Sequence, residues 1–187
     1  MLNIVSSILA PQLPAETGSY ESIATTTVGA GGSLSITFSS IASTWQHLQI
    51  RMIAKCLNTA GGSTQMQFNS DTGANYSWHY LSGDGASASA GAGTSTNYIN
   101  TNVGQQDTTQ YFTAVIDILD YDDTTKYKTT RTLTGIDKNG SGSMQINSGN
   151  WRNTAAITSI TITPQSNTSP TNQFQQYSSF ALYGIKG

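Results

Sequence analysis

Apolar and polar residues alternate with a period of two along most of this chain, the pattern typical of half-buried β-strands. The segment 47–57 shows it most clearly. One face of that segment carries Leu48, Ile50, Met52, Ala54 and Cys56, and the other carries His47, Gln49, Arg51 and Lys55, with Ile53 as the one apolar exception. The spacing therefore predicts a long strand with one face in a core and the other in water.

Similar alternation recurs in short segments separated by turn-forming residues. Such segments cover 33–38, 65–69, 76–81, 112–119, 126–135, 143–147, 157–163 and 179–185. Between them lie turn signals such as Asp120 to Thr125 and Asn139 to Gly142. No stretch of a dozen residues has the period of an amphipathic helix. Nine or ten short strands indicate an all-β fold, an antiparallel two-sheet β-sandwich with jelly-roll-like connectivity, over residues 20–187.

Residues 82–97, SGDGASASAGAGTSTN, contain only small side chains apart from one aspartate. Because such residues cannot build a core, this segment is predicted to be a long flexible loop at one end of the sandwich. Just before it, Tyr76, Trp78 and Tyr80 share one face of a strand and His79 takes the other. That aromatic face is expected either to join the core or, if exposed, to stack on a sugar.

Residues 1–19 read as an apolar arm that precedes the domain. It carries Leu2, Ile4, Val5, Ile8, Leu9 and Leu13. The segment lacks the positively charged start of a signal peptide, and Pro11 and Pro14 prevent a long helix. The arm either packs on its own domain or docks on a neighbouring chain. We favour docking on a neighbour, because an apolar segment needs cover from water.

Charge and cysteine content exclude several classes of protein. Charged residues make up 10% of the 187 residues, and the net charge is −2. The eight basic residues are scattered, so nucleic-acid binding is not expected. The single cysteine, Cys56, excludes an internal disulfide and is predicted to lie in the core. No run of 18 apolar residues is present, so no membrane span is expected.

Residues that could carry out catalysis are sparse. Asp120, Asp122 and Asp123 form an acidic turn without the glycine bend of a calcium loop, and a solvated turn is the preferred interpretation. Asp117 shares a strand face with Val115 and Leu119 and is expected to be an inward or interface carboxylate bonded to a neighbour. The two histidines, His47 and His79, lie on separate strands without metal-ligand spacing. We predict no enzyme, metal or cofactor.

Several motifs together resemble small structural proteins of tailed bacteriophages that are common in aquatic phages. The matching segments are Ile36–Ile41 with Trp45–Arg51, Phe68–Tyr76, Ile116–Tyr121 with Lys126–Thr129, Gly149–Ile160, and Phe180–Lys186. They extend over roughly residues 20 to 187. The resemblance implies a β-sandwich that belongs to a virion, either on the capsid surface or as a module of a tail fibre.

Two functions follow as expectations. The first is a capsid decoration, or cement, protein that binds the major capsid protein or another virion protein through the arm, as a homotrimer by analogy with the family. The alternative is a tail-fibre or head-fibre module that binds a host receptor or surface glycan. Its predicted contact residues are Trp78, His79, Tyr80 and Asp84.

Overall fold

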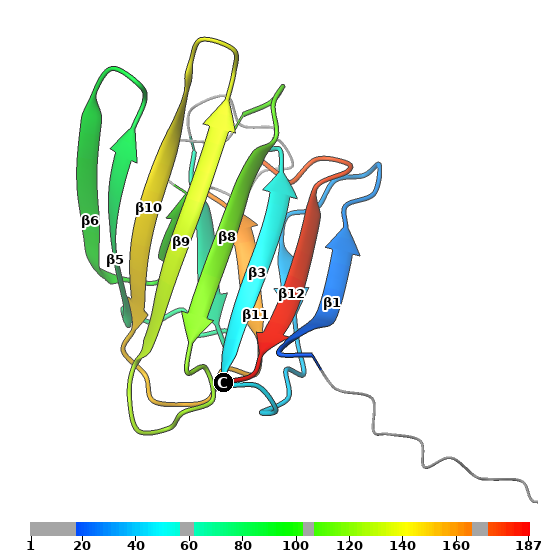
Figure 1. The fold of residues 1–187 in the computed structure, drawn as a ribbon, viewed down its shortest axis with the longest axis vertical. Helices are drawn as coiled ribbons and strands as arrows, with labels where there is room; N and C mark the ends of the chain where they lie inside the picture. Colours follow the sequence, from blue (N-terminus) through cyan, green and yellow to red (C-terminus); the bar gives the residue numbers. More distant parts are fainter. Residues whose placement is uncertain (1–17, 57–61, 103–106, 166–171) are drawn as a thin grey trace, which may run out of the picture.

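The computed structural model describes residues 18–56, 62–102, 107–165 and 172–187 and is an all-β sandwich (Figure 1). The predicted fold class is confirmed, although the described residues form twelve strands rather than nine or ten. In chain order they are β1 (Tyr20–Thr27), β2 (Ile36–Phe38), β3 (His47–Ala54), β4 (Thr64–Phe68), β5 (Tyr76–Gly83), β6 (Ala88–Thr96), β7 (Ile99–Asn102), β8 (Phe112–Leu119), β9 (Lys128–Asp137), β10 (Gly142–Trp151), β11 (Ile160–Pro164) and β12 (Ser179–Ile185).

The strand order is that of a jelly roll with two additional hairpins. One sheet has the order β1-β12-β3-β8-β9-β10-β5-β6 and the other β2-β11-β4-β7. The four-strand sets β1-β12-β3-β8 and β2-β11-β4-β7 give the two sheets of a jelly roll. The hairpins β9–β10 and β5–β6 both join the first sheet, and Figure 1 shows them extending it beyond β8. The larger sheet therefore has an outer face eight strands wide, the face that points away from the smaller sheet.

β3 forms the centre of the core, as its alternation predicts. Its inward side chains Leu48, Ile50, Met52 and Ala54 are buried, and Cys56 just beyond the strand is fully buried. Burial raises the pKa of the Cys56 thiol to about 12, so this cysteine is an inert core residue.

The connection between β4 and β5 links the two sheets through Asp71. Its Oδ1 accepts the Gly73 amide at 2.8 Å, and its Oδ2 accepts the indole N–H of Trp151 at 2.7 Å. The Trp151 ring stacks on Tyr76 with centroids 6.3 Å apart. The Tyr76 hydroxyl in turn accepts the amide of Phe68, on β4, at 3.0 Å. Polar and aromatic contacts thus join β4, β5 and β10 at one point.

The prediction of a flexible loop over 82–97 is wrong. β5 continues to Gly83, and β6 occupies Ala88–Thr96 as the edge strand of the larger sheet. Backbone pairing with β5 holds this segment, and two aromatic rings cover its glycines. A Cβ at Gly91 would meet the Tyr80 ring at 2.6 Å, and one at Gly93 would meet the Trp78 ring at 2.5 Å. Small residues are thus required here because large rings lie across the strand.

β9 and β10 reverse the usual distribution of apolar and polar side chains. Their inward, buried side chains include Thr130, Thr132, Thr134, Gln145 and Asn147. These pack towards β7, whose Asn100, Thr101 and Asn102 are also buried, and the Asn147 side-chain amide donates to the Asn100 carbonyl at 3.3 Å. The outward side chains of the same two strands include Leu133, Met144 and Ile146. Core formation therefore does not account for these three apolar residues.

Candidate docking face on the eight-stranded sheet

Apolar side chains form a continuous row across the outer face of the larger sheet. Strand register places Val115 beside Leu133, Leu133 beside Ile146, and Ile146 beside Leu81. Leu133, Ile146 and Leu81 are 50%, 57% and 58% exposed. Met144, in the next row, is 63% exposed. We call Val115, Leu133, Ile146, Leu81 and Met144 the apolar band. Contiguous apolar surface of this kind marks interaction sites on soluble proteins.

A hollow of about 920 Å³ lies at one end of the apolar band. Its floor includes Gly135 and Gly83, which flank Met144 in the strand register and have no side chains to fill the space. A second hollow of about 270 Å³ adjoins it, lined largely by members of the band with Ala88. The outer face is therefore recessed where it is most apolar, which suits it to an inserted side chain or segment.

The opposite half of the outer face, towards β1, is mainly polar, with the exposed Ile53 as an apolar exception. The Arg51 guanidinium lies over the rings of Tyr20 and Tyr183, at 5.2 and 5.4 Å from their centroids. Gln49 donates through Nε2 to Asp117 Oδ1 at 2.8 Å, and Arg131 donates to Asp117 Oδ2 at 3.1 Å. Asp117 therefore lies with Val115 and Leu119 on the outer face and not inward, and it bonds to neighbouring side chains as predicted. Protein interfaces have a similar composition, with an apolar centre and with Tyr and Arg side chains enriched.

The predicted glycan contacts are divided between the two faces of the larger sheet. Trp78 and Tyr80 point inward, half-buried against β6, and the Trp78 indole N–H is buried. His79 is exposed on the outer face, in register with Ser148 and Ala92. Asp84 lines the larger hollow, where its Oδ1 accepts the amides of Ala86 and Ser87. The structure does not bring these four residues together at one exposed surface, and glycan binding by them stays a prediction.

The predicted arm residues Leu2, Ile4, Val5, Ile8, Leu9 and Leu13 lie outside the described residues, which begin at Gly18. β1 starts at Tyr20 and is an edge strand, at the edge of the larger sheet opposite β6. The arm therefore joins the domain beside the polar half of the outer face.

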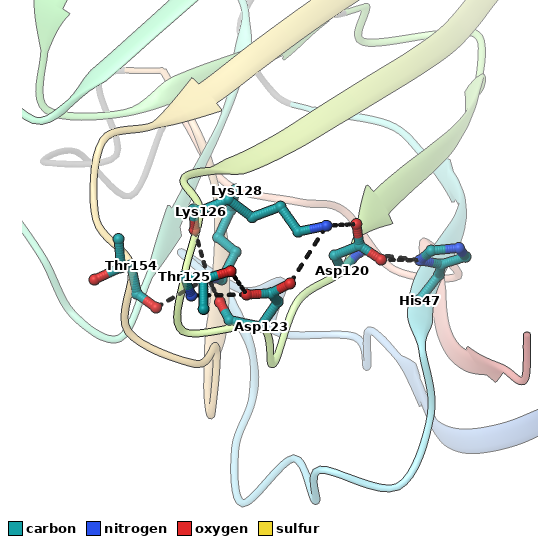
Figure 2. Close-up of polar contacts among 7 residues, drawn as sticks. All are labelled: His47, Asp120, Asp123, Thr125, Lys126, Lys128 and Thr154. Carbon is teal, nitrogen blue, oxygen red and sulfur yellow. Dashed lines mark hydrogen bonds and ion pairs between the residues drawn. The ribbon is translucent and has the colours of Figure 1, made fainter.

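Lys126 pairs with two carboxylates of the acidic turn between β8 and β9 (Figure 2). Lys126 bridges Asp120 at 2.7 Å and Asp123 at 3.3 Å. His47 Nδ1 accepts the Asp120 amide at 3.0 Å, which places the proton of a neutral ring on Nε2. The Asp120 and Asp123 carboxylates are thus already paired with Lys126. No cluster of three or more His, Cys, Asp or Glu side chains suited to a metal ion is present in residues 18–56, 62–102, 107–165 and 172–187.

Lys128 is fully buried below the same turn. Its ammonium donates to the main-chain carbonyls of Asp123, Lys126 and Thr154, the last two at 3.1 Å (Figure 2). Three carbonyl acceptors match the three N–H groups of a lysine. Burial lowers the pKa of Lys128, against the opposing attraction of Asp123, Asp122 and Asp120. The Lys128 side chain therefore holds two loops together from inside the protein and is not available to a ligand.

Acid is expected to destabilise the protein below about pH 4. Hydrogen bonds from Thr125 lower the pKa of Asp123 to about 2. Burial acts to raise the pKa of Asp107, but hydrogen bonds from Lys138 and Thr109 hold it well below its ordinary value. The pKa values of Asp123 and Asp107 are lower in the folded protein than in the unfolded chain, so the unfolded chain binds more protons than the folded protein at acidic pH. The stabilisation by these two carboxylates is complete above about pH 5 and disappears as the pH falls.

Urea titrations at pH 7, 5, 4 and 3 check this expectation. The free energy of unfolding should change little from pH 7 to about 5 and then decrease steeply. Asp107→Asn should flatten the decrease, since one of the responsible carboxylates is then absent. Equal stability at pH 7 and pH 3 would show that these carboxylates do not have depressed pKa values.

Comparisons of the chain with protein-family models, with curated proteins and with solved structures give no match. None of the described residues lies in a helix that could cross a membrane. The strand order defines a jelly-roll β-sandwich, and the outer face of its larger sheet carries a recessed apolar surface.

Proposed function

We propose that this protein is a non-enzymatic structural protein of a bacteriophage particle, a decoration protein on the capsid surface that acts by holding protein chains together. One observation carries the proposal: β9 and β10 place polar residues inside and Leu133, Met144 and Ile146 outside. Isolated domains are stabilised by the opposite arrangement, because burial of apolar area drives folding. Apolar residues on the outer face contribute a burial free energy only when another surface covers them.

Two further features support this proposal. Jelly-roll sandwiches are a common architecture of viral capsid domains, although the fold alone does not define a function. The sequence also resembles virion structural proteins over most of the domain. The partner is the major capsid protein or another virion protein, and repeated contacts around a shell would add to the strength of attachment.

A substitution on the outer face tests the proposal. Ile146→Glu places a charge on an exposed position, so the free energy of unfolding should change by less than about 0.5 kcal/mol. Attachment should nevertheless weaken at least about tenfold, because a desolvated charge opposes burial of the face. Co-sedimentation of the purified protein with capsids of the encoding phage that lack it measures attachment.

Leu34→Glu is the matched control. Leu34 is also an exposed apolar residue, at 44%, but it precedes β2 in the smaller sheet. This variant should attach to capsids like the original protein. If Ile146→Glu attaches equally well, the outer face is not the docking surface, and if the original protein does not attach at all, the decoration function is wrong.

A further inference from the structure

The structure describes a recessed apolar surface, and the sequence contains an apolar segment of matching character. The seventeen residues before Gly18 include six large aliphatic side chains and no charged residue before Glu16. The apolar band likewise contains no charged side chain. Asp84 and Asp137 line the hollow, and the Oδ1 atom of each accepts main-chain amides of its own turn. The arm and the band therefore both need apolar cover.

We propose that the apolar band and its hollow bind residues 1–17 of the arm of a second copy of this chain. This inference deepens the proposed function and rests on it, because it names one partner of the same outer face. The width of the band fits the segment: from β8 to β5, the strands that carry it, the sheet spans about 14 Å, at about 4.8 Å per strand. Four or five extended residues would cover that width, at about 3.3 Å each.

The position of β1 favours a second copy over the same chain. The arm joins at β1, four strands from β9 and near the row that pairs Tyr20 with Ile185. To reach Leu133 on its own domain, the arm would cross about 25 Å of outer face, which takes about eight extended residues. Those residues, 10–17, would carry Leu13 over Arg51, Asp117 and Arg131. An arm from another copy can reach the band without crossing this polar half of its own domain.

An arm of one copy in the hollow of the next is a head-to-tail contact, which closes into a ring when the rotation permits. The homotrimer expected from the resemblance is one such ring. The inference therefore predicts an oligomer in solution, without any capsid present.

Disulfide trapping between two differently tagged full-length chains tests the inference. One chain carries Ile8→Cys in the arm and the other carries Ile146→Cys in the band. The native Cys56 stays in place, since it is fully buried. After mixing and mild oxidation, the mixed-tag disulfide should form at least about fivefold more than with Leu34→Cys as the second chain. Leu34 is exposed but lies outside the outer face.

Sedimentation velocity of the full-length protein completes the test. An oligomer that Ile8→Asp with Leu9→Asp and, separately, Leu133→Asp convert to monomers supports the inference. Monomers of the original protein, or a disulfide that forms only when both cysteines are on one chain, overturn it. These outcomes are independent of the decoration function: monomers that still attach to capsids overturn only the arm exchange, and oligomers that do not attach overturn only the decoration function.

Discussion

Trp151→Ala is expected to lower the free energy of unfolding by about 3 to 5 kcal/mol, the largest effect of any single substitution considered for this protein. The indole is 1% exposed and packs against Tyr76 and Phe68, with ring centroids 6.3 and 5.6 Å away. Its removal leaves a cavity between the sheets and takes from Asp71 Oδ2 a hydrogen bond of 2.7 Å. Thermal or urea unfolding followed by circular dichroism measures the loss.

Trp78→Ala is the graded control for that experiment. Trp78 lies on the neighbouring strand β5, but it is less buried than Trp151, so its loss should cost less. Asp71→Ala should reproduce part of the Trp151→Ala effect, and the two losses should not add, because the residues share one hydrogen bond. Equal losses for Trp151→Ala and Trp78→Ala would contradict a central role for Trp151.

Lys128→Met is expected to lower the free energy of unfolding by about 2 to 4 kcal/mol. The substitution leaves the carbonyls of Asp123, Lys126 and Thr154 without their shared donor inside the protein. The desolvation cost of the ammonium disappears as well, which offsets part of the loss. Because those carbonyls belong to two loops, hydrogen exchange should also become faster in the turn between β8 and β9 and in the segment that follows β10.

Lys126→Met provides the comparison two residues away. The Lys126 side chain is 54% exposed, and exposed ion pairs contribute at most about 1 kcal/mol. The variant should therefore remain close to the original protein in stability. If the two lysine variants are equally stable, Lys128 does not hold the loops together.

The sequence predicts the fold where large apolar residues alternate strictly with polar ones. β3, β8 and β12 are examples, and the predicted segments 112–119 and 179–185 coincide with β8 and β12. β6 was not predicted because its side chains are too small to show alternation, and its order comes from pairing and from the rings of Trp78 and Tyr80. β7 was not predicted either, since all four of its residues are buried and three are polar.

The candidate site could not be located from periodicity alone. Alternation identifies β9 and β10 as strands, but it does not say which face points inward. The usual expectation would bury Leu133 and Ile146 and expose the threonines between them. The structure reverses this because the partner strand β7 presents Asn100, Thr101 and Asn102 to that side. Only the pairing of distant segments therefore shows that apolar residues line the outer face.

The outer face combines features that are typical of a protein-binding surface. It has an apolar centre with a hollow, and an ordered border in which Arg51 lies over two tyrosine rings. Fixed side chains lose little conformational entropy on binding, so more of the interaction energy appears as affinity. The face is accordingly suited to lasting contacts between chains.

An electron-microscopy map of the purified phage particle would test the docking face most directly. We predict that the domain lies on the capsid with the outer face of its eight-stranded sheet covered by protein, so that Leu133 and Ile146 are buried. A domain attached through β2-β11-β4-β7, with Leu133 and Ile146 facing solvent, would contradict the assignment of this face. Absence of the protein from the particle would contradict the decoration function itself.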